Sequence, residues 1–213
     1  FALHNLESFY LQYFPKNTPV ARKHNGLVAF FWYRREDLGW EDIKRLIEKN
    51  TFTTIYIQNR PDPHQTKLVI SEEDMATYPI VFLEWFQDQT EYLHFLEKID
   101  VYFSPRVLEG IGLSFLEAMS LGKVVVSLDA PTMNEYIEHE KNGFLFRKGE
   151  NKKIDFTKID FTNLLVFNQQ FSKKFEAQID TVYQMIESYK SKKTYTKGQL
   201  YHLVDWGLRL LVK

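Results

Sequence analysis

Short apolar runs alternate with amphipathic stretches along most of the chain, and this alternation is the feature that most restricts the fold. The strand candidates are residues 26–33, 53–58, 67–70, 80–86, 100–105, 123–129 and 143–146. The helix candidates between them are residues 40–50, 89–99, 113–121 and a short segment after Pro131. Such a pattern predicts a doubly wound α/β domain with a mostly parallel sheet. Ligands of these sheets bind beyond the carboxyl ends of the strands.

Composition excludes several classes of function. The 213 residues are 44% apolar, enough for a sizeable core, and 27 basic residues against 28 acidic ones give a net charge of -1. The chain therefore lacks the basic character of a nucleic-acid-binding protein. Cysteine is absent, which excludes disulfides, thiolate zinc sites and a cysteine nucleophile and fits a reducing compartment. No apolar run is long enough to be a signal peptide or to cross a membrane.

The two ends of the chain depart from the alternating pattern. We expect residues 1–25 to be an interdomain linker, residues 26–165 the α/β domain and residues 166–213 C-terminal helices, and we expect the sequence to begin inside a longer chain. The repeat KIDFTKIDFT (153–162) predicts a charged surface loop without a function. Two amphipathic helices, 175–189 and 199–213, flank the basic segment 190–197.

The stretch LEGIGLSFLEAM (108–119) carries the strongest chemical signal. Glu109 should lie in the loop after the strand at 100–105, and Glu117 on the following helix. The amides near two glycines, together with the positive end of a helix, bind phosphate well, and the two carboxylates can accept hydrogen bonds from hydroxyl groups. The pair therefore suits a sugar joined to a nucleotide. From this local pattern alone, a structural turn with solvated acids is the favoured alternative, and the dinucleotide-binding fingerprint is incomplete at Phe115.

Residues 101–146 resemble the donor-binding segment of the retaining GT-B glycosyltransferases of family 4, also called group 1. The family pattern E-G-x-G-x-x-x-x-E-A-M places a glutamate, seven residues and a second glutamate, and Glu109 and Glu117 stand at its two acids. Further matching positions are Gly110, Gly112, Ala118, Met119, Gly122, Val124, Val125, Val126, Asn134, Glu135 and residues 142–145. The resemblance extends over residues 26–146 and is strongest after residue 100.

The resemblance implies the C-terminal half of a GT-B fold and a hexosyltransferase that keeps the anomeric configuration. Glu109 is then the catalytic residue, which binds the donor hexose and acts electrostatically rather than as an established nucleophile. Glu117 binds the ribose. The residues that the resemblance assigns to the donor are Arg34, Arg35, Gly110, Ile111, Gly112, Leu113 and Glu117. It implies a nucleotide-diphosphate sugar as donor and neither a metal nor another cofactor.

Several positions depart from the family pattern. Leu38 stands where the family has a lysine near the diphosphate, and IQNRPDP (57–63) replaces a glycine-rich turn. Either Arg34 or Arg35 could supply the family's arginine, and two solvated surface arginines remain the alternative. Trp85 or Phe86 could lie beside the base, although we favour core packing for both. The six histidines show no metal-ligand spacing, and we expect His139 at the surface.

The sequence thus predicts a cytoplasmic glycosyltransferase domain for surface polysaccharide or lipopolysaccharide synthesis, acting on a glycan or lipid acceptor. Its partner is an N-terminal acceptor-binding domain absent from this chain, so we expect little turnover from this chain alone. The basic segment 190–197 and the helix after it leave peripheral membrane contact open, but we favour a helix that packs across the interdomain cleft. The alternative function is a non-catalytic α/β binding module, and a GT-B epimerase is a nearer rival.

Overall fold

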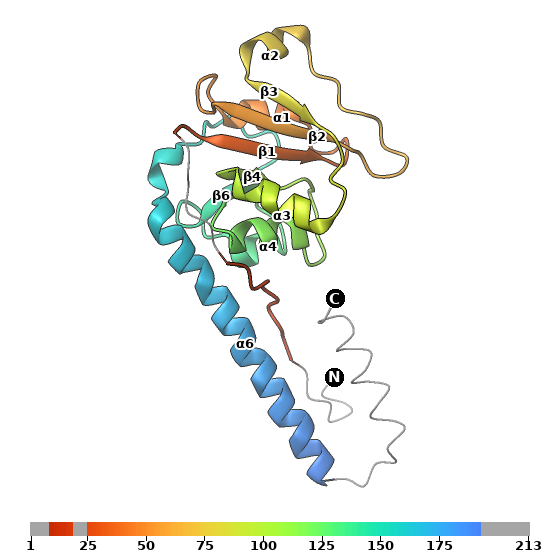
Figure 1. Cartoon of the computed structure of the whole chain (residues 1–213), viewed down its shortest axis with the longest axis vertical. Coiled ribbons are helices and arrows are strands. Elements are labelled where there is room, and N and C mark those ends of the chain that lie inside the picture. The colour runs from red at the N-terminus through yellow and green to blue at the C-terminus, as the bar shows by residue number, and fades with distance from the viewer. Residues whose placement is uncertain (1–8, 19–24, 193–213) are drawn as a thin grey trace. The chain divides into compact units, whose positions relative to one another are not determined.

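Six parallel strands form a single sheet in the order β3-β2-β1-β4-β5-β6. The computed structural model of the chain describes residues 9–18 and 25–192 (Figure 1). The strands are β1 (Val28–Tyr33), β2 (Thr54–Asn59), β3 (Ile80–Leu83), β4 (Val101–Phe103), β5 (Val124–Leu128) and β6 (Gly143–Phe146). The strand order reverses between β1 and β4, as in Rossmann-like folds. The predicted doubly wound sheet is confirmed.

Helices connect the strands and cover both faces of the sheet. They are α1 (Trp40–Leu46), α2 (Glu72–Thr77), α3 (Gln89–Glu97), α4 (Leu113–Ser120), α5 (Met133–Tyr136), the 3-10 helix η2 (Phe156–Lys158) and α6 (Phe161–Lys192). In the view of Figure 1, α3 and α4 lie in front of the sheet. Since side chains alternate along a strand, Phe30 and Phe31 point to opposite faces. Phe30 packs against Phe95 of α3, with ring centroids 5.0 Å apart.

The segment 67–70 is not a strand, so this prediction is wrong. The Asn59 side chain accepts a hydrogen bond from the Leu68 amide at 2.9 Å and donates one to the Leu68 carbonyl at 2.8 Å. A side chain thus satisfies both backbone groups that a neighbouring strand would otherwise pair. Helix α2 follows and was missed, although Ser71 and Asp74 are spaced like a helix start. The Ser71 hydroxyl oxygen accepts a hydrogen bond from the Asp74 amide at 3.1 Å.

The repeat at 153–162 is charged and mostly exposed, as predicted, but part of it is helical and Phe156 and Ile159 are buried, which corrects the prediction of a loop. Phe156 is buried and packs on Phe52 and Phe144, with ring centroids 5.3 Å away in both cases. Each copy of the repeat also starts a helix. At the start of η2, Asp155 accepts a hydrogen bond from the Thr157 amide at 3.0 Å. At the start of α6, Asp160 accepts one from the Thr162 amide at 2.9 Å. The two acidic residues of the repeat, Asp155 and Asp160, are helix caps.

The chain divides into two compact units, and α6 belongs to both. One unit comprises residues 13–172, and the other the flanking segments. In the second unit, Gln12 accepts a hydrogen bond from Lys174 Nζ at 2.7 Å, and its amide donates to Gln178 Oε1 at 3.1 Å. The helix predicted at 175–189 is confirmed as part of α6. The helix predicted at 199–213 and residues 193–197 of the basic segment lie outside the described residues.

A buried polar cluster holds α1 and α2 together. Asp74 Oδ2 accepts hydrogen bonds from Trp40 Nε1 at 3.0 Å and from Lys44 Nζ at 2.9 Å. Burial alone would raise the pKa of Asp74, but the bonds from Lys44 and Trp40 outweigh it and the pKa is lowered. The Asp74 carboxylate therefore stabilises the fold above its ordinary pKa of 3.8, and that stability is lost as the pH falls through the lowered value.

We expect Asp74→Ala to lower the free energy of unfolding at pH 7 by about 2–3 kcal/mol, because it leaves the buried Trp40 donor without its acceptor and removes the buried partner of Lys44. Denaturant titration measures this change. The matched control is Glu41→Ala, which removes the exposed second partner of Lys44 and should cost less than about 1 kcal/mol. Equal losses in the two variants would contradict a structural role for the buried cluster.

Candidate functional site

Loops from three neighbouring strands meet at the carboxyl edge of the sheet, where the strand order reverses. They follow β2, β1 and β4, which are adjacent in the sheet. A cavity of about 370 Å³ opens between the loops after β1 and β4. It is lined by Trp32, Arg34, Pro105, Arg106, Glu109, Ile111, Gly112, Leu113 and Ser114. This is the place at which a Rossmann-like sheet binds its ligand.

Asp62, from the loop after β2, connects the two arginines of the cavity. Its Oδ1 accepts a hydrogen bond from Arg34 Nε at 2.7 Å, and its Oδ2 accepts one from Arg106 Nη2 at 2.9 Å. The Asp62 amide also donates to the Arg34 carbonyl at 2.8 Å. Arg106 Nε lies 3.9 Å from Glu109 Oε1. Charged side chains from three loops are therefore held in one network.

The structure separates the two arginines that the sequence left as alternatives. Arg34 lines the cavity, its side chain is 24% exposed, and its guanidinium carbon lies 4.5 Å from the centre of a Trp32 ring. Arg35 does not line the cavity, is 46% exposed and pairs with Asp37 at 3.2 Å. Leu38 is fully buried. In the loop after β1, Arg34 is thus the cation that faces the cavity.

Glu109 is held in an environment that disfavours its charge. The side chain is only 13% exposed, and burial raises the pKa of Glu109 above its ordinary value of 4.5. Arg106 and Arg34 favour the charged form, but they offset only part of the burial effect, and Asp62 adds to it. A carboxylate in this setting is poised to gain from hydrogen-bond donors on a ligand.

The loop after Glu109 is shaped by two glycines with different constraints. Gly112 has φ +72, and a Cβ there would lie 2.1 Å from the Phe115 ring, so the fold itself requires glycine. A Cβ at Gly110 would meet no protein atom within 4 Å. Packing therefore does not explain Gly110, but the close approach of a ligand to the backbone would. The first amides of α4 lack carbonyl partners within the helix, and residues 112–114 place this end at the cavity.

Thr132 supports the same loop and was missed from the sequence. Its hydroxyl shares its one hydrogen between the carbonyls of Glu109 and Gly110, which lie 2.9 and 3.0 Å from the Thr132 hydroxyl oxygen. Its backbone has φ +76, which is costly for a β-branched residue. Strain of this kind is typical of functional sites. Local sequence gives no signal for it, because the two partners lie over twenty positions away.

Glu117 occupies a neighbouring place rather than the cavity wall. It accepts a hydrogen bond from Gln89 Nε2 at 3.0 Å. Burial raises the pKa of Glu117, and the Gln89 bond opposes this only in part. Both Glu109 and Glu117 also raise the pKa of the fully buried Tyr102, although burial is the larger cause. The two carboxylates therefore both act electrostatically on one buried hydroxyl group.

The aromatic residues after β3 separate into two roles. Phe86 packs against Phe30 and Phe95, so the expected core packing is confirmed for this residue. Trp85 is 55% exposed and contacts Trp32 edge to face, with centroids 5.7 Å apart. Core packing is thus wrong for Trp85. Because Trp32 also lines the cavity, Trp85 is an exposed ring next to the site.

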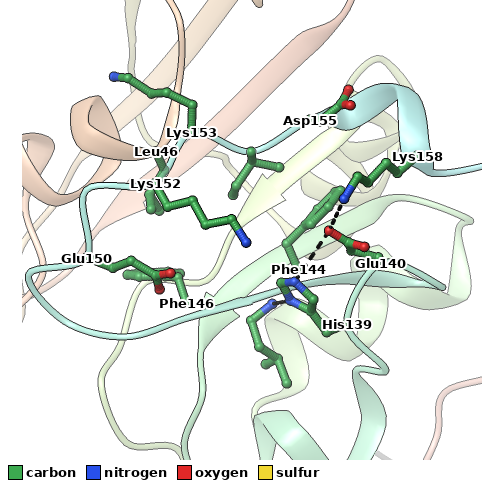
Figure 2. A pocket seen from close by; sticks show the side chains of 12 residues that line it. Leu46, His139, Glu140, Phe144, Phe146, Glu150, Lys152, Lys153, Asp155 and Lys158 are labelled. Atoms are coloured by element: carbon green, nitrogen blue, oxygen red, sulfur yellow. Dashed lines mark hydrogen bonds and ion pairs between the residues drawn. The ribbon is translucent and has the colours of Figure 1, made fainter.

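A second, smaller cavity of about 90 Å³ lies beside β6 and the 150–158 segment, as Figure 2 shows. Charges of both signs line it, and several are already paired. Lys158 Nζ donates to Glu140 Oε1 at 2.6 Å, and Lys153 Nζ donates to the Ile47 carbonyl at 2.7 Å (Figure 2 shows both lysines). His139 on its wall is exposed, as expected. Lys158, Glu140 and Lys153 of this cavity are thus already engaged by protein partners.

Two features are absent from the described ranges 9–18 and 25–192. These residues contain no group of three or more His, Cys, Asp or Glu side chains placed to hold a metal ion. None of the helices in this part of the chain is long and apolar enough to cross a membrane. His4, His24 and His202 lie outside it.

Residues 73–157 match the sequence model of the family described as Glycosyl transferases group 1. The matched range extends from α2 to η2, includes Glu109 and Glu117, and is less than half of the chain. The amylovoran biosynthesis glycosyltransferase AmsK of Erwinia amylovora is 32% identical over 96 residues. The match covers 42% of this chain and only 23% of AmsK.

Solved structures share the fold at low sequence identity. Anabaena Alr3699/HepE in complex with UDP has a TM-score of 0.51 at 18% identity, over 77% of this chain and 49% of that chain. Its complex with UDP-glucose has a TM-score of 0.50 at 20% identity, with the same coverage. The chain thus spans about half the length of this structural relative, and the likeness shows a common fold.

The raised pKa of Glu109 leads to a prediction about stability. The folded state holds this proton more tightly than the unfolded chain, so the stabilising contribution is present below pH 4.5 and is lost as the pH rises through the raised pKa. Glu109→Gln stays uncharged. We expect its Tm to exceed that of the wild type by about 1–4 °C at pH 8 and to equal it at pH 4.

Calorimetric unfolding at the two pH values measures the difference. The control is Glu48→Gln, at an exposed position. The Tm of this variant should equal that of the wild type at both pH values. A Glu109→Gln variant that is less stable than the wild type at pH 8 would show that the arginines hold the Glu109 charge favourably.

Proposed function

We propose that this chain is the donor-binding half of a group 1 glycosyltransferase, and that its carboxyl-edge cavity binds a nucleotide-diphosphate sugar. One observation carries the proposal: a largely buried glutamate, two arginines and the start of α4 converge on one cavity at the switch point of the sheet. Guanidinium groups and helix amides suit a diphosphate. The Glu109 carboxylate suits the hydroxyl groups of the adjoining sugar.

The donor would extend from Glu109 towards Glu117. With the hexose at Glu109 and the diphosphate near residues 110–113, the ribose would reach Glu117, and exposed Trp85 is available to the base. Stabilisation of the departing diphosphate by the arginines and the α4 amides would then contribute much of the rate. We extend the proposal to transfer with retention, in which Glu109 binds and stabilises charge rather than forming a covalent bond.

The acceptor would be a glycan or lipid of a surface polysaccharide or lipopolysaccharide, which the similarity to an amylovoran biosynthesis enzyme supports. The acceptor site would lie mainly on a separate N-terminal domain, so this chain alone would bind donor with little turnover. The absence of cysteine fits a cytoplasmic location. Peripheral membrane contact would involve the basic segment 190–197.

A non-catalytic binding module is the second candidate, and one observation favours it. Leu38, which occupies the position of the family's lysine, is fully buried and cannot take over that role. Such a module would keep the fold but lose affinity for the donor. Donor binding that depends on Glu117 therefore separates the two functions.

We expect titration calorimetry with UDP-, GDP- and ADP-linked sugars to show saturable binding of one donor. Glu117→Ala should weaken this binding about tenfold, because it removes one charged hydrogen-bond acceptor. Glu73→Ala, at an exposed position on α2, is the control and should bind like the wild type. A folded wild-type protein that binds none of the donors would favour the non-catalytic module.

The two adjacent arginines should differ in their effect on the same donor. Arg34→Ala removes a guanidinium from the cavity wall and should weaken binding by at least about tenfold. Arg35→Ala removes one that pairs with Asp37 outside the cavity, so its effect should be clearly smaller. A larger loss of donor affinity in Arg35→Ala than in Arg34→Ala would mean that the loop after β1 changes conformation when the donor binds.

A further inference from the structure

The charges around the Glu109 cavity are balanced only because of Arg106. Two cations, Arg34 and Arg106, face two anions, Asp62 and Glu109. Without Arg106 the set would carry a net charge of -1, and a diphosphate would meet repulsion where the proposed function requires attraction. The positive end of α4 adds about half a charge and could not reverse this by itself.

No other cation is available from the loop after β1. Arg35 pairs with Asp37 away from the cavity, and Leu38 is buried. Arg106 comes instead from the loop after β4, three residues before Glu109. It lines the cavity and its side chain is 33% exposed, so part of it is open to a ligand.

Asp62 fixes the position of Arg106 without using all of its donors. A guanidinium carries five N–H groups in a rigid plane. The bond from Nη2 to Asp62 Oδ2 takes one of them, and Nε lies beside Glu109 at 3.9 Å. The same carboxylate holds Arg34 through its other oxygen. The two guanidinium groups are therefore kept on one wall of the cavity before any ligand arrives, which reduces the entropy lost on binding.

We infer that Arg106 is a diphosphate-binding residue, which Asp62 orients beside Arg34 so that the two guanidinium groups bind the phosphates together. The inference rests on the proposed function and adds the source of the second cation. It differs from a purely structural ion pair, in which Arg106 would neutralise Asp62 and Glu109 but would not contact the ligand. The two roles differ in how the effect of a substitution depends on the number of phosphates.

The test is a calorimetric titration of the chain with UDP, UMP and uridine, and with the guanosine and adenosine series if uridine compounds do not bind. Arg106→Ala should weaken binding of the diphosphate about ten- to a hundredfold, that of the monophosphate less, and that of the nucleoside by no more than about twofold. Arg106→Lys keeps the charge but not the planar pair of donors and should lie between wild type and Arg106→Ala.

Controls separate folding from binding. Arg45→Ala removes an exposed arginine of α1 and should bind all three compounds like the wild type. Thermal unfolding of each variant checks that it is folded. If Arg106→Ala does not fold, Arg106→Lys replaces it in the titrations. Increasing salt should weaken diphosphate binding less in Arg106→Ala than in the wild type, because one phosphate contact is gone.

The outcomes distinguish this inference from the function on which it rests. An unchanged diphosphate affinity in Arg106→Ala, or an equal loss for diphosphate and nucleoside, would overturn the role of Arg106 while the donor site stands. If the wild type binds none of the three nucleotide series, the proposed donor site itself fails, and the inference fails with it.

Discussion

The arrangement of the site depends on the pairing of the Asp62 carboxylate with two arginines. Its two oxygens join Arg34 and Arg106, and so connect loops from β2, β1 and β4. Parallel pairing brings the ends of these strands to one edge, but pairing alone does not fix the loops that follow. A partly buried ion pair with well-placed hydrogen bonds does so, since loss of either partner leaves a charge uncompensated. The shape of the cavity therefore follows from a residue that is not itself on its wall.

Several features around this cavity act against stability. The pKa values of Glu109 and Glu117 are raised by burial, and Thr132 adopts a backbone conformation that disfavours a β-branched residue. None of these features improves the packing of the core. Proteins break local rules of this kind mainly where a ligand needs the strained or desolvated group. The concentration of such costs around one cavity is why we propose function there.

The sequence predicts the sheet well because burial of whole apolar strands is a local signal. It fails at 67–70, where the Asn59 side chain replaces strand pairing, and at 153–162, where acidic caps resemble a solvated loop. Glu109 and Gly112 are recognisable from their spacing. Asp62 and Arg106 are not, because their roles arise only when three distant loops meet. The difference between Arg34 and Arg35 likewise depends on loop geometry that no local pattern specifies.

The repeated unit between β6 and α6 has a consequence for how this connection can change. In both copies an aspartate accepts a hydrogen bond from the backbone amide of the threonine two positions later. Each copy therefore carries a complete helix start. The copies differ in burial, since Phe156 of the first fills the core beside Phe52. Gain or loss of one five-residue unit would thus alter the length of the linker without removing the signal that begins α6.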